Sequence, residues 1–143
     1  MEESKVTRTV REAVVKAFEK GEEIKTKVGE ITKDAVKTAL EKTEPTRENV
    51  KEIAGDAVRG AIEGAKKVRV EASEITRQAV EGAVQGTKEA GTKAAEMAKH
   101  AAEGALLSAK EAGIKAAEIA KDALKGLVEG VKEVFKKEEE KEG

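Results

Sequence analysis

The sequence has no cysteine, tryptophan or tyrosine, and it contains one histidine, one proline and two phenylalanines. The lack of cysteine excludes disulfide bonds, thiolate chemistry and zinc sites built on cysteine. Because aromatic side chains form the stacking platforms of proteins that bind single-stranded nucleic acid, their scarcity argues against that class of function. No apolar run reaches the roughly 18 residues that suggest a membrane span.

Charge is abundant but balanced. Charged residues make up 40% of the 143 residues, yet the formal net charge is only -1. Such a mixture gives no overall field that would attract nucleic acid, so no nucleic-acid partner is expected. The opening segment is charged and periodic, unlike a secretory signal, and a cytoplasmic location is therefore the expectation.

A twenty-two-residue repeat runs through the chain six times without insertion or deletion. Helix formers dominate, and no stretch alternates as a strand does. Twenty-two is twice 11, and 11 residues close three helical turns at about 3.67 residues per turn. The repeat predicts an all-α protein with one domain, residues 1–137, and a charged frayed tail, residues 138–143. The six frames begin at Arg8, Glu30, Glu52, Glu74, Glu96 and Glu118.

Two breaks are expected in this helical pattern. The first is at 43–46, where Pro45 lacks a backbone N–H and clashes with the preceding turn. The second is at 91–92, because Gly91 can adopt the left-handed conformation beyond a helix end. These breaks predict an antiparallel bundle of three long helices with two repeats each, straight or slightly right-handed. The first helix would span about 5–42.

One long bent helix after Pro45 is the open alternative. A glycine inside a helix costs only about 1 kcal/mol relative to alanine, so Gly91 and Gly113 do not force turns. The segment 68–73 contains neither glycine nor proline and is expected to remain helical.

The apolar residues of each repeat form one stripe along the predicted helix. Lysine and arginine lie along its margins, and acidic residues fill the opposite face. A β-branched isoleucine recurs at the second position of four repeats, which predicts a packing layer between helices. The residues of that layer are Ile31, Ile53, Ile75 and Ile119, and Ala57 and Ile62 are further packing candidates from the apolar stripe.

A row of small residues runs beside the apolar stripe, in pairs spaced by four. Such spacing lets two helix backbones approach closely. Because the flanks are charged, the row predicts helix–helix packing in water, within the chain or between chains. The pairs are Gly60 and Gly64, Gly82 and Gly86, Gly104 and Ser108, and Gly126 and Gly130.

No catalytic, metal or cofactor site is predicted. His100 occupies a position where other repeats carry aspartate or glutamine, which places it on the polar face. The glycines are spaced by four in helices and do not form a phosphate-binding loop. We therefore expect no enzyme activity, no cofactor and no small-molecule substrate.

Two segments, Lys88–Ala105 (KEAGTKAAEMAKHAAEGA) and Lys110–Gly126 (KEAGIKAAEIAKDALKG), resemble the short repeats of group 3 late-embryogenesis-abundant proteins, which are half as long as the repeat of this chain. The repeat period and the break at Pro45 are similar, more distantly, to the exchangeable apolipoproteins. The likeness covers about 8–137. It implies stress protection or binding to lipid surfaces, by a chain that becomes helical on drying or on a membrane.

The residues favour a non-enzymatic structural protein that acts through helix–helix packing, including self-association. The resemblance supplies the alternative, a stress-protective or lipid-surface protein with weak affinity for anionic membranes. Whether the free chain is already helical separates the two hypotheses.

Overall fold

The computed structural model describes residues 3–127, and within them it is all-α, with seven helices and no strand. The predicted helical class is therefore confirmed for this part of the chain. The helices are α1 (Lys5–Glu19), α2 (Ile24–Glu41), α3 (Arg47–Lys67), α4 (Ala72–Glu89), α5 (Thr92–Glu96), α6 (Ala98–Ala112) and α7 (Ile114–Lys125).

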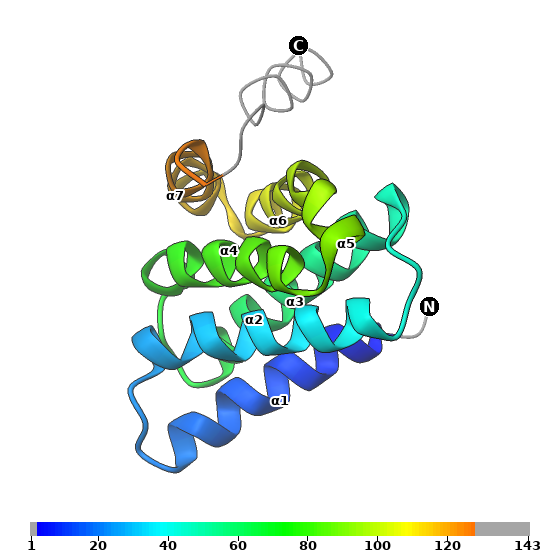
Figure 1. Ribbon diagram of the computed structural model, residues 1–143. Coiled ribbons are helices and arrows are strands. Elements are labelled where there is room, and N and C mark those ends of the chain that lie inside the picture. The colour runs from blue at the N-terminus through cyan, green and yellow to red at the C-terminus, as the bar shows by residue number, and fades with distance from the viewer. Residues whose placement is uncertain (1–2, 128–143) are drawn as a thin grey trace.

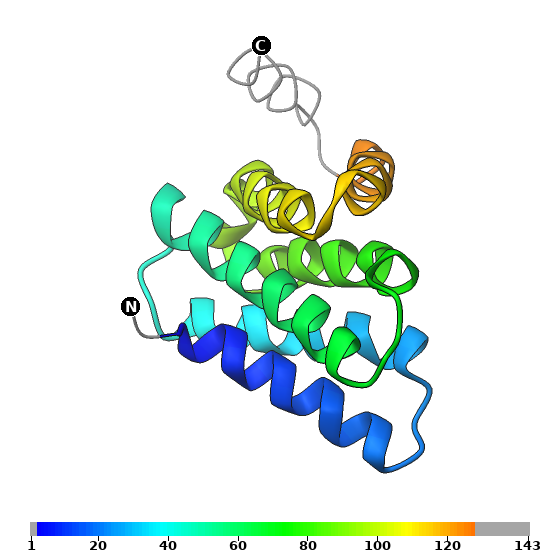
Figure 2. The same cartoon turned by 180° about the vertical axis from the view of Figure 1, so that it is seen from behind.

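The helices form three stacked hairpins, namely α1–α2, α3–α4 and α6–α7, with the short α5 leading into α6 (Figures 1 and 2). In Figure 1 the first hairpin lies at the bottom, in blue and cyan, and the third lies at the top. α1 packs on α3 and α2 on α4, while α3 packs on α6 and α4 on both α6 and α7. The middle hairpin thus joins the two outer ones, as in proteins built from stacked repeats.

The prediction of three helices with two repeats each is wrong. The sequence predicts one helix over 5–42, but the chain turns back between α1 and α2. Gly21, with a φ of +78°, ends α1. Its N–H donates to the Phe18 carbonyl (3.0 Å), and the Glu22 N–H donates to the Ala17 carbonyl (3.0 Å). This is a Schellman motif, which uses the left-handed conformation that glycine adopts readily.

The prediction that 68–73 stays helical is also wrong. Arg69 has a φ of +64°, and its N–H donates to the Lys66 carbonyl over 3.1 Å. The Val70 N–H donates to the Ala65 carbonyl over 2.8 Å. The same Schellman motif therefore ends α3, with an arginine in the position that glycine usually takes.

The two breaks that the sequence predicts are present. The chain leaves its helix at 43–46, and Thr46 caps α3 by accepting a hydrogen bond from the Asn49 N–H (3.1 Å). Gly91, with a φ of +135°, separates α4 from α5, and Gly113, with a φ of +132°, separates α6 from α7. Both glycines lie between helices, which excludes one long bent helix over the second half of the chain.

The core is built mostly from alanine and valine. Ile75, Leu106 and Leu124 are the only side chains larger than valine among the largest completely buried ones in the described part. Small side chains bury little area each, and burial contributes roughly 25 cal/mol per Å². Stability therefore depends on helices that approach one another closely.

Candidate functional site

The small residues lie where helices of successive hairpins meet. A Cβ atom added to Gly60 of α3 would overlap the backbone carbonyl of Thr7 in α1. At Gly104 of α6 it would overlap the carbonyl of Lys51 in α3. Only glycine fits such a contact, because a side chain would separate the two backbones. The same holds for Gly82 against the carbonyl of Gly29 and for Gly86 against that of Lys33, both of α2, while a Cβ atom at Gly64 would overlap the Val14 side chain and lie 3.0 Å from the Arg11 carbonyl oxygen of α1.

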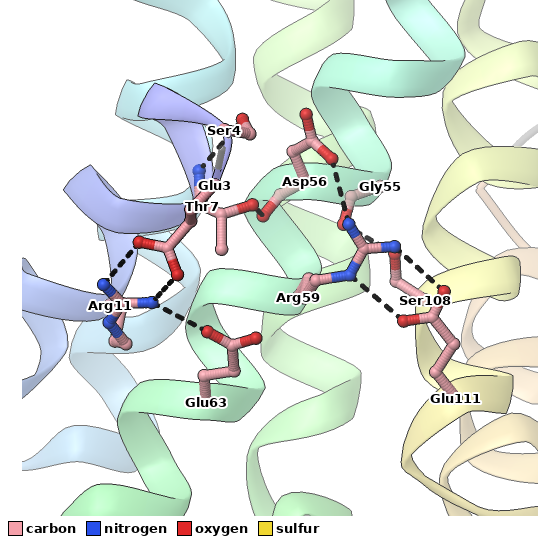
Figure 3. A network of polar contacts seen from close by, with 10 residues as sticks. All are labelled: Glu3, Ser4, Thr7, Arg11, Gly55, Asp56, Arg59, Glu63, Ser108 and Glu111. Carbon is pink, nitrogen blue, oxygen red and sulfur yellow. Dashed lines mark hydrogen bonds and ion pairs between the residues drawn. The ribbon is translucent and has the colours of Figure 1, made fainter. Parts of the chain in front are cut away.

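These contacts share one offset in the sequence. Thr7 meets Gly60, Lys51 meets Gly104 and Ser108 meets Gly55, and each pair is 53 residues apart. Figure 3 shows the polar part of this contact, in which the Ser108 hydroxyl donates to the buried Gly55 carbonyl over 2.6 Å. The contact between hairpins is therefore the same each time, shifted by two repeats and nine residues.

Three of the ion pairs between hairpins follow an offset that is shorter by one residue. They join α1 to α3 and α3 to α6, and two of them are drawn in Figure 3. Exposed ion pairs each contribute only about 0–1 kcal/mol, so they select the register of stacking more than they stabilise it. The pairs are Arg11–Glu63 (2.9 Å), Arg59–Glu111 (2.9 Å) and Lys51–Glu103 (2.8 Å).

Glu103 is the least exposed carboxylate of these pairs. Burial alone would raise the pKa of its carboxyl group, but the hydrogen bond from Lys51, the positive charge of Lys51 and the nearby His100 together outweigh burial. The pKa of Glu103 is consequently lowered from its usual 4.5. The His100 Nδ1 lies 3.7 Å from the Glu103 carboxylate.

This lowered pKa predicts acid sensitivity. A depressed pKa in the folded state stabilises the fold above pH 4.5, and the contribution disappears as the pH falls through the folded-state value. We expect the difference in unfolding free energy between the wild type and Glu103→Gln to be largest above pH 4.5 and to shrink below it. Urea unfolding at a series of pH values measures this difference. The exposed Glu118→Gln is the control, and an equal pH dependence in both variants would contradict the assignment.

The isoleucine layer is not uniform. Ile75 and Ala57 are completely buried and Ile62 nearly so, whereas Ile31, Ile53 and Ile119 are only partly buried. Two of the partly buried residues, Ile31 and Ile53, line a surface groove, which the predicted packing layer and small-residue row do not include.

An apolar groove of about 740 Å³ opens between α1 and α2 and is also lined by the N-terminal half of α3. Val6 and Ala13 of α1, Ile31 and Ala35 of α2, and Ile53 of α3 contribute its apolar surface. Its volume lies within the range of about 300–1,000 Å³ that is typical of binding sites. Its charged lining residues are Lys5, Asp34, Lys42, Glu52 and Asp56.

One signal in the sequence could have located this groove. The row of small residues is absent from the first two repeats. At the equivalent positions two repeats earlier, the first hairpin has larger side chains in place of the glycines of the middle hairpin. Another helix therefore cannot bring its backbone close to the first hairpin at these positions. These side chains are Lys16 and Lys20 in place of Gly60 and Gly64, and Thr38 and Lys42 in place of Gly82 and Gly86.

The remaining sequence candidates fall outside these contacts. Gly126 caps the C-terminus of α7, and a Cβ atom there would meet no described atom within 4 Å. Gly130 and the tail 138–143 lie outside the described residues. His100 is partly buried, and residues 3–127 hold no group of three or more histidine or acidic side chains placed to bind a metal. Over the same residues, no helix combines the length and the apolarity needed to cross a membrane.

Comparison with family models, with curated proteins and with solved structures finds no match to this chain.

Proposed function

We propose that this chain is a non-enzymatic scaffold that works through helix–helix packing. The observation that carries the proposal is the recurrence of one contact, a small residue against a backbone carbonyl 53 residues away, between all three hairpins. Contacts that repeat at a fixed offset specify geometry and not a single reactive site. Three ion pairs on α3 support the same interpretation, because they repeat at one offset of their own and so favour one register of that stack.

The burial of the apolar stripe also favours a scaffold over a lipid-surface protein. A helix that lies on lipid needs a free apolar face with bulky anchors. Within residues 3–127 the exposed large apolar side chains are Phe18, 48% exposed, and Ile114, 81% exposed. They belong to different hairpins, so they do not form one continuous apolar face.

The test is the state of the free chain in dilute buffer. We expect a helical circular dichroism spectrum and one cooperative thermal transition, because each outer hairpin packs on the middle one. Binding to anionic vesicles in a flotation assay should be weak and should fall with added salt, since surface attraction is screened. A random-coil spectrum that becomes helical only on vesicles or on drying would contradict the scaffold and favour the late-embryogenesis-like alternative.

A further inference from the structure

We propose that the groove between α1 and α2 binds an amphipathic helix of a partner protein. The inference rests on the proposed helix-packing function and specifies where a partner docks. Its basis is that the same surface on the next hairpin is already covered by a helix of this chain.

That covered surface lies on α4. Ile75, Ala79, Gly82 and Gly86 are spaced by three or four residues, so they share one face of the helix. Gly82 and Gly86 sit directly against the backbone of α2. Ile75 and Ala79 are 0% exposed. This face of α4 therefore receives α2.

Two repeats earlier, the corresponding face of α2 is open. The equivalent residues are Ile31, Ala35, Thr38 and Lys42, and all four line the groove. Ile31 and Ala35 are only partly buried, although their counterparts on α4 are inaccessible to solvent. The first hairpin therefore leaves exposed the helix face that is covered by another helix in the second hairpin.

The lining determines which helix fits. Thr38 and Lys42 replace glycines, so a docked helix cannot approach as closely as α2 approaches α4. To fill about 740 Å³ it must instead present bulky apolar side chains, spaced by three or four, that reach Ile31 and Ile53. Asp56 is paired with Arg59, so Asp34 and Glu52 balance Lys5 and Lys42 around the groove, which favours a partner helix with charges of both signs beside its apolar face.

A peptide based on α2 serves as the probe. It comprises residues 24–41 with Thr32→Leu, so that apolar side chains recur every fourth residue, at Val28, position 32, Val36 and Leu40. The peptide carries a fluorescent dye, and its binding to the full chain is followed by fluorescence anisotropy. We expect saturable binding of one peptide per chain. The unsubstituted peptide should bind more weakly, because threonine buries less apolar surface.

Ala13→Glu and Ala39→Glu test the location. Both alanines are partly buried and line the groove, so the apolar face of the docked helix would remove water from a carboxylate placed there. Such burial is unfavourable, and each variant should weaken peptide binding about tenfold or more. Ala117→Glu is the matched control, since Ala117 is a partly buried alanine of α7, at the other end of the stack, and should bind as the wild type does.

Three results would overturn the inference. The first is that the chain is helical and melts cooperatively but does not bind the peptide. The second is that both groove variants bind the peptide as the wild type does. The third is that analytical ultracentrifugation shows a dimer, which Ala39→Glu dissociates. In the last case a second copy of the chain fills the groove. An unfolded free chain would instead refute the proposed scaffold function, so the two failures are distinguishable by circular dichroism.

Discussion

Replacing Gly104 with valine is expected to prevent α6 from docking closely on α3. A Cβ atom at this position would overlap the carbonyl oxygen of Lys51, which belongs to a helix backbone and cannot rotate away. Overpacking typically costs about 1–3 kcal/mol, and a clash with backbone lies at or above the upper end. For a chain of this size a loss of about 3 kcal/mol lowers the melting temperature by roughly 10 °C, measured by circular dichroism.

Gly126→Ala is the control for this substitution. A Cβ atom there meets no described atom within 4 Å, so its melting temperature should be unchanged or slightly raised. Gly104→Ala should fall between the two. Should Gly104→Val instead melt at the wild-type temperature or above it, glycine would matter there only as a poor helix former and the contact with Lys51 would be absent in solution.

Truncating Ile75 to alanine is expected to cost far more than the same change at Ile31. Both residues occupy the second position of their repeat, two repeats apart. Ile75 is 0% exposed and lies on the face of α4 that receives α2, whereas Ile31 is partly buried and lines the groove. Removing a fully buried isoleucine side chain costs about 2–5 kcal/mol, because the transfer free energy is lost and a cavity remains.

The unfolding free energies of Ile75→Ala and Ile31→Ala, obtained from urea titrations, test this difference directly. We expect a loss of about 1 kcal/mol or less for Ile31→Ala, since water already reaches the groove. Equal losses in the two variants would mean that the groove is closed in solution, and a larger loss at Ile31 would place the core in the first hairpin.

The sequence predicts the helices well but their number poorly, and the reason is physical. Each repeat closes six helical turns, so one continuous helix and a helix followed by a turn show the same apolar periodicity. Pro45 and Gly91 are strong breakers and the structure has turns there. Arg69 is not a breaker by type, yet it occupies the same repeat position as Gly91 and Gly113. Comparing repeats, and not residue types, would have revealed that turn.

The groove could not be predicted from helix patterns because it depends on which helices have neighbours. Ile31 and Ile75 are identical in type and repeat position, but only the helix that carries Ile75 has a preceding hairpin packed on it. Propensity and periodicity describe one helix at a time and carry no information about its place in a stack. The missing glycines at Thr38 and Lys42 are the signal that was available.

The fixed offset between contacting residues also limits how the length of this chain can change. An insertion of two whole repeats after α4 would add one hairpin and leave all the remaining contacts between hairpins in register. An insertion of a single repeat would reverse the direction of each later helix. A helix with the contact residues of α1 would then lie in the position that α2 takes within a hairpin. Duplication or deletion within the coding sequence would therefore preserve the fold only when it adds or removes whole hairpins.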